Sequence, residues 1–126
     1  RRSANNTIAV KNALDNLESK HVEDQKLVLP QQNGTLRLPL KQITHIEGDR
    51  NYSLIHLSNG TKELSSKNLA YFDDILLDKN FFRSHRSFLI NKYHIQELRN
   101  GHFVLKNGFE IPVSRRNKGD AETWFL

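Results

Sequence analysis

The 126-residue sequence contains no cysteine, no methionine and only three prolines. Without cysteine the chain has no disulfide, no thiolate metal ligand and no cysteine nucleophile. No apolar run approaches the roughly 18 residues of a membrane span, and the polar start lacks the apolar segment of a signal peptide. We therefore expect a cytoplasmic protein without membrane association.

Positive charge is in modest excess and unevenly placed. The chain carries 19 Lys and Arg against 14 Asp and Glu, a net charge of +5. Residues 1–82 hold 11 basic and 10 acidic side chains, whereas residues 83–126 hold 8 and 4. The later basic residues group at 83–86 and at 115–118. Such grouping indicates a surface for an anionic partner, and solvated charges on turns are the alternative.

The first 25 residues read as a linker. A helix is predicted at about residues 7–20, where Ile8, Ala13, Leu14 and Leu17 follow helical spacing. An isolated helix of this length is marginal in water, so we expect it to pack on an upstream domain, the main domain or a second copy. Together with the missing methionine, this leads us to expect a further domain upstream. The main domain is predicted to span residues 26–126.

From residue 26 onward the pattern predicts short antiparallel strands. The dipeptide Asn-Gly occurs at residues 33–34, 59–60, 100–101 and 107–108, between segments that alternate or are rich in β-formers. Asn and Gly tolerate the positive φ of type I′ hairpin turns, so this dipeptide is a strong hairpin signal. Four such turns in about 80 residues predict a mostly β fold.

Three segments depart from the strand pattern. Residues 67–77 carry an apolar stripe at helical spacing, with Ser66 as the expected N-cap, and we predict a helix packed on the sheet. The segment Pro39–Ile43 is expected to form one short turn of helix. A last short helix is possible in the C-terminal residues 115–126, although Gly119 weakens it.

No catalytic or cofactor-binding set is found. The six histidines are dispersed without HExxH, and no GxGxxG, GxxxxGK[ST] or GxSxG motif occurs. The histidines at positions 45, 56 and 102 fall in strand patterns and are expected on sheet surfaces. Glu47 and Asp49 read as solvated carboxylates. We therefore expect no enzyme activity, no metal and no cofactor.

The most informative segment is FFRSHRSFLIN, residues 81–91. Apolar anchors flank five consecutive polar residues, which would hold hydrogen-bond donors in fixed register. Nucleic-acid recognition needs this, because phosphate contacts position a protein and base contacts specify sequence. Arg is the preferred partner of the guanine O6/N7 edge. The alternative is that Arg83 or His85 pairs with Asp73, Asp74 or Asp78 as a structural lock.

Two further segments carry arginine at strand ends. In IPVSRRNK, residues 111–118, Pro112 suits an edge strand because it cannot donate to a ladder, and the polar residues follow it. In IEGDRNYS, residues 46–53, Gly48 and Asn51 indicate a turn or bulge with Arg50 near its tip. Plain turn chemistry is the alternative there. Three such connections on one β scaffold would form a coherent binding edge.

These segments, in this order, resemble the LytTR-type DNA-binding domain. The matching residues are Ile43–Ser53, Asn68–Leu77, Phe81–Asn91 and Asn107–Arg115, and the resemblance covers about residues 26–124. One departure is Ser84, where the family more often has an apolar residue, and which we expect to soften local packing.

The resemblance implies a fold, a function and a site. It implies an elongated, mostly β fold of short antiparallel sheets with one or two short helices. It implies double-stranded DNA binding through turns and loops, as the effector domain of a bacterial two-component response regulator behind a receiver domain, with a homodimer possible on paired sites. The expected DNA-binding residues are Arg50, Asn51, Tyr52, Arg83, His85, Arg86, Ser87, Ser114, Arg115, Arg116, Asn117 and Lys118, with bases read mainly by Arg86, Arg115 and Asn51.

Three other readings are less well supported by the residues. A protein-interaction module of the same fold would use the basic edge to bind an acidic partner domain. A single-stranded nucleic-acid binder would need a row of exposed aromatics, whereas most aromatics here occupy apolar-face positions. An enzyme would need a catalytic set.

Overall fold

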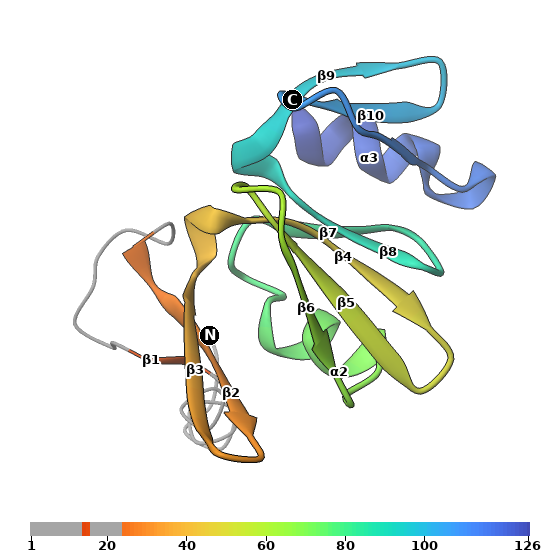
Figure 1. Ribbon diagram of the computed structural model, residues 1–126. Helices are drawn as coiled ribbons and strands as arrows, with labels where there is room; N and C mark the ends of the chain where they lie inside the picture. Colours follow the sequence, from red (N-terminus) through yellow and green to blue (C-terminus); the bar gives the residue numbers. More distant parts are fainter. Residues whose placement is uncertain (1–13, 16–23) are drawn as a thin grey trace.

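The computed structural model describes residues 14–15 and 24–126. In this part of the chain three antiparallel sheets succeed one another (Figure 1). The first has the order β1-β2-β3, the second β6-β5-β4-β8-β7 and the third β11-β10-β9. The predicted mostly β class is confirmed.

The strands are short and are joined by turns and single helical turns. Their bounds are β1 Leu14–Asp15, β2 Lys26–Gln31, β3 Gly34–Pro39, β4 Ile43–Asp49, β5 Tyr52–Leu57, β6 Lys62–Ser65, β7 Phe81–His85, β8 Phe88–Asn91, β9 Ile95–Arg99, β10 His102–Leu105 and β11 Glu110–Pro112. The helices are α2 Leu69–Ile75 and α3 Lys118–Phe125, with 3-10 turns η2 Leu40–Gln42, η3 Lys92–His94 and η4 Arg115–Asn117. No helix in the described ranges is long and apolar enough to cross a membrane.

Most of the helix predicted at residues 7–20 lies outside the described residues. The two residues of that range that are described form the strand β1 and pair with β2, Leu14 opposite Leu27 and Asp15 opposite Lys26. At these two positions the chain is strand rather than helix.

All four Asn-Gly dipeptides lie where hydrogen-bonded antiparallel strands are joined, as predicted. They connect β2 to β3, β5 to β6, β9 to β10 and β10 to β11. Only Asn100-Gly101 has positive φ at both residues, 53° and 79°, as a type I′ turn requires. In the other three only the glycine has positive φ, so the expectation of type I′ geometry was wrong there. The hairpins form because glycine supplies that conformation without a Cβ penalty.

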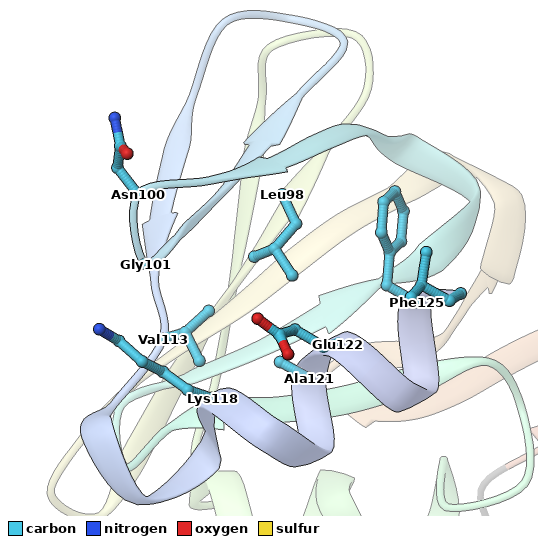
Figure 2. A pocket seen from close by; sticks show the side chains of 9 residues that line it. Leu98, Asn100, Gly101, Val113, Lys118, Ala121, Glu122 and Phe125 are labelled. Carbon is cyan, nitrogen blue, oxygen red and sulfur yellow. The ribbon is translucent and has the colours of Figure 1, made fainter.

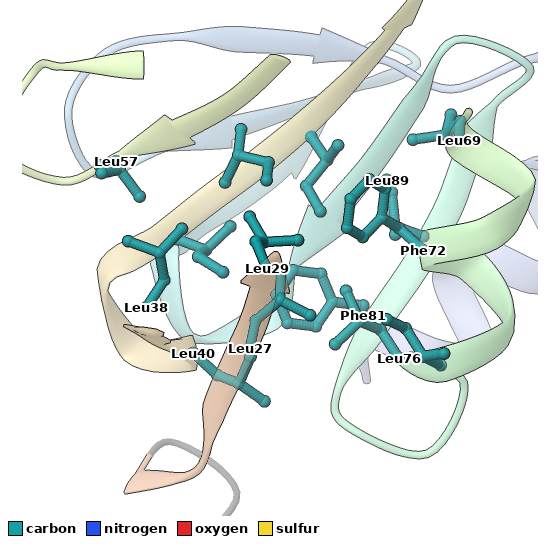
Figure 3. Close-up of a cluster of buried hydrophobic side chains, with 14 residues drawn as sticks. Leu27, Leu29, Leu38, Leu40, Leu57, Leu69, Phe72, Leu76, Phe81 and Leu89 are labelled. Carbon is teal, nitrogen blue, oxygen red and sulfur yellow. The ribbon is translucent and has the colours of Figure 1, made fainter. Parts of the chain in front are cut away.

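The larger core lies between the β2–β3 hairpin, one face of the five-stranded sheet and α2 (Figure 3). The alternation of β2 buries Leu27 and Leu29. Helix α2 adds Leu69 and Phe72 from its apolar stripe. It lies within the predicted residues 67–77 but begins two residues later than predicted. Asn68 rather than Ser66 caps it, since the Asn68 Oδ1 accepts a hydrogen bond from the Tyr71 N–H at 3.0 Å.

A second core joins the β11-β10-β9 sheet, α3 and the other face of the five-stranded sheet. Phe103 of β10 is fully buried there, and the Trp124 ring of α3 stacks on Phe82 of β7 with centroids 5.0 Å apart. The Lys92 ammonium donates to the Trp124 carbonyl at 2.9 Å. These contacts confirm the predicted C-terminal helix and hold α3, and η4 before it, against β7.

A buried amide joins the end of β8 to the start of β4. The Asn91 Nδ2 donates to the carbonyls of Leu40 at 3.0 Å and Ile43 at 2.8 Å, and its Oδ1 accepts from the Tyr93 N–H at 3.0 Å. Asn91 is only 3% exposed, so this satisfied amide belongs to the scaffold.

Candidate nucleic-acid interface

Two hairpin turns lie at the same end of the five-stranded sheet. Strand β4 pairs with β8, with Glu47 opposite Phe88, so the β4–β5 turn and the β7–β8 turn are neighbours. The Gly48 N–H donates to the Ser87 carbonyl at 2.8 Å and ties the two turns together. The first two predicted segments are thus adjacent in space.

The β4–β5 turn exposes Arg50 and Asn51. Arg50 has a φ of +59°, an uncommon conformation for a residue with a side chain, and both residues are exposed. Tyr52 is also exposed, but its hydroxyl donates to the Asp49 Oδ2 at 2.9 Å. That hydrogen bond to a carboxylate raises the pKa of Tyr52. Arg50 and Asn51 are therefore the free groups of this segment.

Gly48 lies within β4 and not in the turn, contrary to the prediction. A Cβ at this position would sit 2.8 Å from the Cβ of Leu69, the first residue of α2. The glycine is needed because the helix approaches the strand closely, which seats α2 beside the two turns.

The β7–β8 turn presents His85 and Arg86. The His85 Nδ1 accepts a hydrogen bond from the Ser87 N–H at 3.1 Å, so a neutral ring carries its proton on Nε2 and can donate it outward. Arg86 is exposed, and within the described part of the chain it forms no ion pair. Both side chains are available to a partner.

Arg83 is bound within the protein instead. Its Nη1 lies 3.5 Å from the Asp73 Oδ2 of α2, and its Nη2 donates to the Arg86 carbonyl at 2.8 Å. Of the two alternatives considered for Arg83, the structural lock is the one that the geometry displays. Among the three aspartates considered, Asp73 is the one that makes the contact.

The third segment is joined to β7 by hydrogen bonds. The Ser84 hydroxyl donates to the Pro112 carbonyl at 3.0 Å, and the Ser114 N–H donates to the Ser84 carbonyl at 2.8 Å. The Asn117 amide donates to the carbonyls of Arg83 at 3.3 Å and Ser84 at 3.4 Å. Asn117 therefore acts as a clamp on the turn.

Because Ser84 departs from the family pattern, we expected it to soften the local packing. The structure shows a well-packed Ser84 instead. It is fully buried at a bulge between Arg83 and His85, and its hydroxyl is hydrogen-bonded across to β11. A polar side chain is accommodated here because it has a carbonyl partner. Pro112, on the edge strand β11 as predicted, supplies that partner.

A hollow of about 490 Å³ opens between the second and third segments, and it is lined by Arg83, His85, Arg86, Ser114, Arg116 and Asn117. Arg116 lines this hollow and Arg115, although exposed, does not. The Ser114 hydroxyl is buried and has no hydrogen-bond partner among the described residues. We call the residues Arg50–Asn51, Arg83–Ser87 and Ser114–Asn117 the basic edge.

Lys118 faces a different hollow. It lines a separate space of about 490 Å³ between α3 and the β9–β10 turn, with Leu98, Val113 and Phe125 (Figure 2). Its Cε lies 3.5 Å from where a Cβ of Gly101 would be. The structure thus groups eleven of the twelve predicted DNA-binding residues at or beside the basic edge and places the Lys118 side chain apart from them.

Two histidines expected on a sheet surface are buried. The rings of His45 and His56 stack 4.1 Å apart at 12°, and Phe109 of the β10–β11 turn lies 5.3 Å from His45. Burial, and then the nearby His56, lowers the pKa of His45 to about 3. The strand alternation does place both histidines on one face. Nothing local reveals that the third sheet docks there and covers them.

Within the described ranges, no group of three or more His, Asp or Glu side chains is placed to hold a metal ion. The basic edge itself offers hydrogen-bond donation and positive charge. Arginine forks, an imidazole N–H and an amide held on tied turns are suited to anionic oxygens and base edges.

Comparison with known proteins identifies the family. Residues 33–125 match the model of the LytTr DNA-binding domain. A solved LytTr DNA-binding domain from Bacillus cereus shares the fold, with a TM-score of 0.65 and 21% identity over 79% of this chain and 94% of that one. No curated protein matches the sequence significantly. The chain belongs to the LytTR family of DNA-binding domains, which is a non-catalytic family.

Proposed function

We propose that the chain binds double-stranded DNA sequence-specifically through the basic edge, as the effector domain of a bacterial response regulator acting in the cytoplasm. One observation carries the proposal: His85, Arg86 and Arg116, from two segments about thirty residues apart, line one hollow. Hydrogen bonds from Ser84 and Asn117 join those segments. A tied pair of turns loses little conformational entropy when it meets DNA.

We assign roles to the side chains from their positions and their chemistry. Arg86 and Arg116, exposed and free of acidic partners in the described part of the chain, are assigned to base edges, because a planar guanidinium matches guanine O6 and N7. Their position in the hollow is why Arg116 replaces Arg115 as the expected base-reading residue. Arg115 and Arg50 are assigned to phosphates, and Asn51 to a base at the far turn.

The regulatory setting rests on the family resemblance. A receiver domain upstream would control access to DNA or the pairing of two effector domains on paired sites. Two copies on one duplex would add their contacts and raise the affinity without any new interface chemistry. Both the receiver domain and the homodimer are parts of the proposal.

Selection of bound duplexes from a random pool tests the function. We expect enrichment of a defined motif by the wild-type chain and none by an Arg86→Ala, Arg116→Ala double variant. Lys41→Ala is the matched control, because Lys41 lies at the opposite end of β4 from the β4–β5 turn. Failure of the wild-type chain to enrich any motif would refute the proposal and favour an acidic protein partner for the same edge.

A further inference from the structure

The Arg83 side chain props up the turn that carries Arg86. Its Nη2 donates to the Arg86 carbonyl at 2.8 Å, three residues along the chain, so the guanidinium spans the base of the β7–β8 turn. The same side chain buries its Nε, which has no hydrogen-bond partner in the described residues. A guanidinium in this position makes structural contacts within the protein and is not a ligand for DNA.

Asp73 contacts the Arg83 guanidinium from a different element. It projects from the last part of α2, and its Oδ2 lies 3.5 Å from the Arg83 Nη1. The two side chains are 36% and 33% exposed, so their ion pair adds little to folding stability. Its effect is to fix which way the guanidinium points, since a carboxylate accepts in the plane of the fork.

We propose that Asp73 is a positioning residue for DNA recognition, acting through Arg83 on the backbone of Arg86. This inference rests on the proposed function. It is unexpected on charge grounds, because an acidic side chain beside a DNA-binding surface repels phosphates. Position and charge therefore predict opposite effects when the carboxylate is removed.

The neighbouring Asp74 provides a matched control. It lies on the same helix, is exposed, and makes no ion pair or hydrogen bond that involves Arg83. Asp73→Asn and Asp74→Asn remove the same charge from adjacent positions. Any general electrostatic effect on DNA binding should appear in both variants.

The experiment measures affinity for the selected duplex and for a scrambled duplex, after equal thermal unfolding shows that the variants are folded. Asp74→Asn should bind both duplexes as well as wild type or up to about twofold better. Asp73→Asn should bind the selected duplex about fivefold more weakly and the scrambled duplex nearly unchanged. Asp73→Glu, which keeps the carboxylate, should restore most of the loss.

Arg83→Lys supplies the second arm, because lysine keeps the charge but cannot bond both partners. If Asp73 acts through Arg83, adding Asp73→Asn to Arg83→Lys should cause no further loss on the selected duplex. Equal binding by Asp73→Asn and Asp74→Asn, or additive losses in the double variant, would overturn the positioning role while leaving DNA binding intact. Absence of a selected motif for wild type and Asp74→Asn alike would overturn both.

Discussion

At the scale of single residues, two arginines of one short segment have different surroundings. Arg83 and Arg86 are three residues apart, yet the first is bound to Asp73 and to the turn backbone while the second is exposed. Both arginines were included in the predicted site because a sequence shows which side chains are charged but not where they point. Directions depend on α2, which reaches β7 only in the folded chain.

Gly48 gives a prediction about close packing. Gly48→Ala would place a Cβ 2.8 Å from the Leu69 Cβ, so we expect a loss of about 1–3 kcal/mol in the free energy of unfolding. Gly119→Ala is the control, because nothing lies within 4 Å of its added Cβ and the helix should gain slightly. Denaturant unfolding measures both. A Gly48→Ala variant as stable as wild type would mean that α2 does not approach β4 this closely.

His45 gives a prediction about pH. Its folded pKa of about 3 lies below its unfolded value near 6.5, so the unfolded chain binds the extra proton and stability falls as pH drops between these values. From pH 7 to pH 5 we expect His45 to account for a loss of about 2 kcal/mol. The Thr44 hydroxyl donates to the His56 carbonyl at 3.2 Å, so the neutral His45 Nδ1–H donates to Thr44.

His45→Phe tests this assignment, since it keeps a buried ring and removes the titration. Unfolding free energies at pH 7 and pH 5 should converge in the variant. A small slope will remain, because burial also lowers the pKa of His94. An unchanged pH dependence in His45→Phe would show that other groups cause it.

At the scale of elements, the predictable features were those with a local cause. The position of the Asn-Gly turns follows from the dipeptide and the stripe of α2 from its spacing, and both are confirmed, although only one of the four turns has type I′ geometry. The predicted cap of α2 was wrong because Ser66 and Asn68 are both good capping residues, and only the backbone conformation decides which of them caps the helix. The Ser84–Pro112 bond and the covering of His45 by Phe109 were not predictable, because both depend on the docking of distant sheets.

The joint made by Asn91 is testable at this scale. Asn91→Ala removes a buried donor from the Leu40 and Ile43 carbonyls and should cost about 2–3 kcal/mol of unfolding free energy. Asn107→Ala, on an exposed turn, should cost less than about 1 kcal/mol. Thermal or denaturant unfolding compares the two. Similar small losses would contradict a structural role for the Asn91 amide.

At the scale of the molecule, the modest net charge of +5 is enough to form a basic surface, because several of the basic side chains lie together at the basic edge. Arg50, Arg86, Arg115 and Arg116 are exposed at the basic edge and form no ion pairs within the described residues. The three segments that carry them together span more than sixty residues of the sequence. Their convergence is a property of the sheet order, which composition alone does not reveal.

This gathering predicts a salt dependence. If Arg50 and Arg115 contact phosphates, Arg115→Ala should reduce the slope of log affinity against log salt by about 1. Lys41→Ala, at the opposite end of β4, should leave the slope unchanged. Titrations of a labelled duplex between low and physiological salt give the slopes. Equal slopes for Arg115→Ala and wild type would remove Arg115 from the phosphate contacts.

The most direct test of the account is the affinity of Arg86→Ala and Arg116→Ala for the selected duplex and for single-base variants of it. We expect each substitution to cost about 1–3 kcal/mol on the selected duplex and to abolish discrimination at one base pair. Folding should be unaffected, since both side chains are exposed. If both variants bind the selected duplex as tightly and selectively as wild type, the basic edge does not read DNA and the account is wrong.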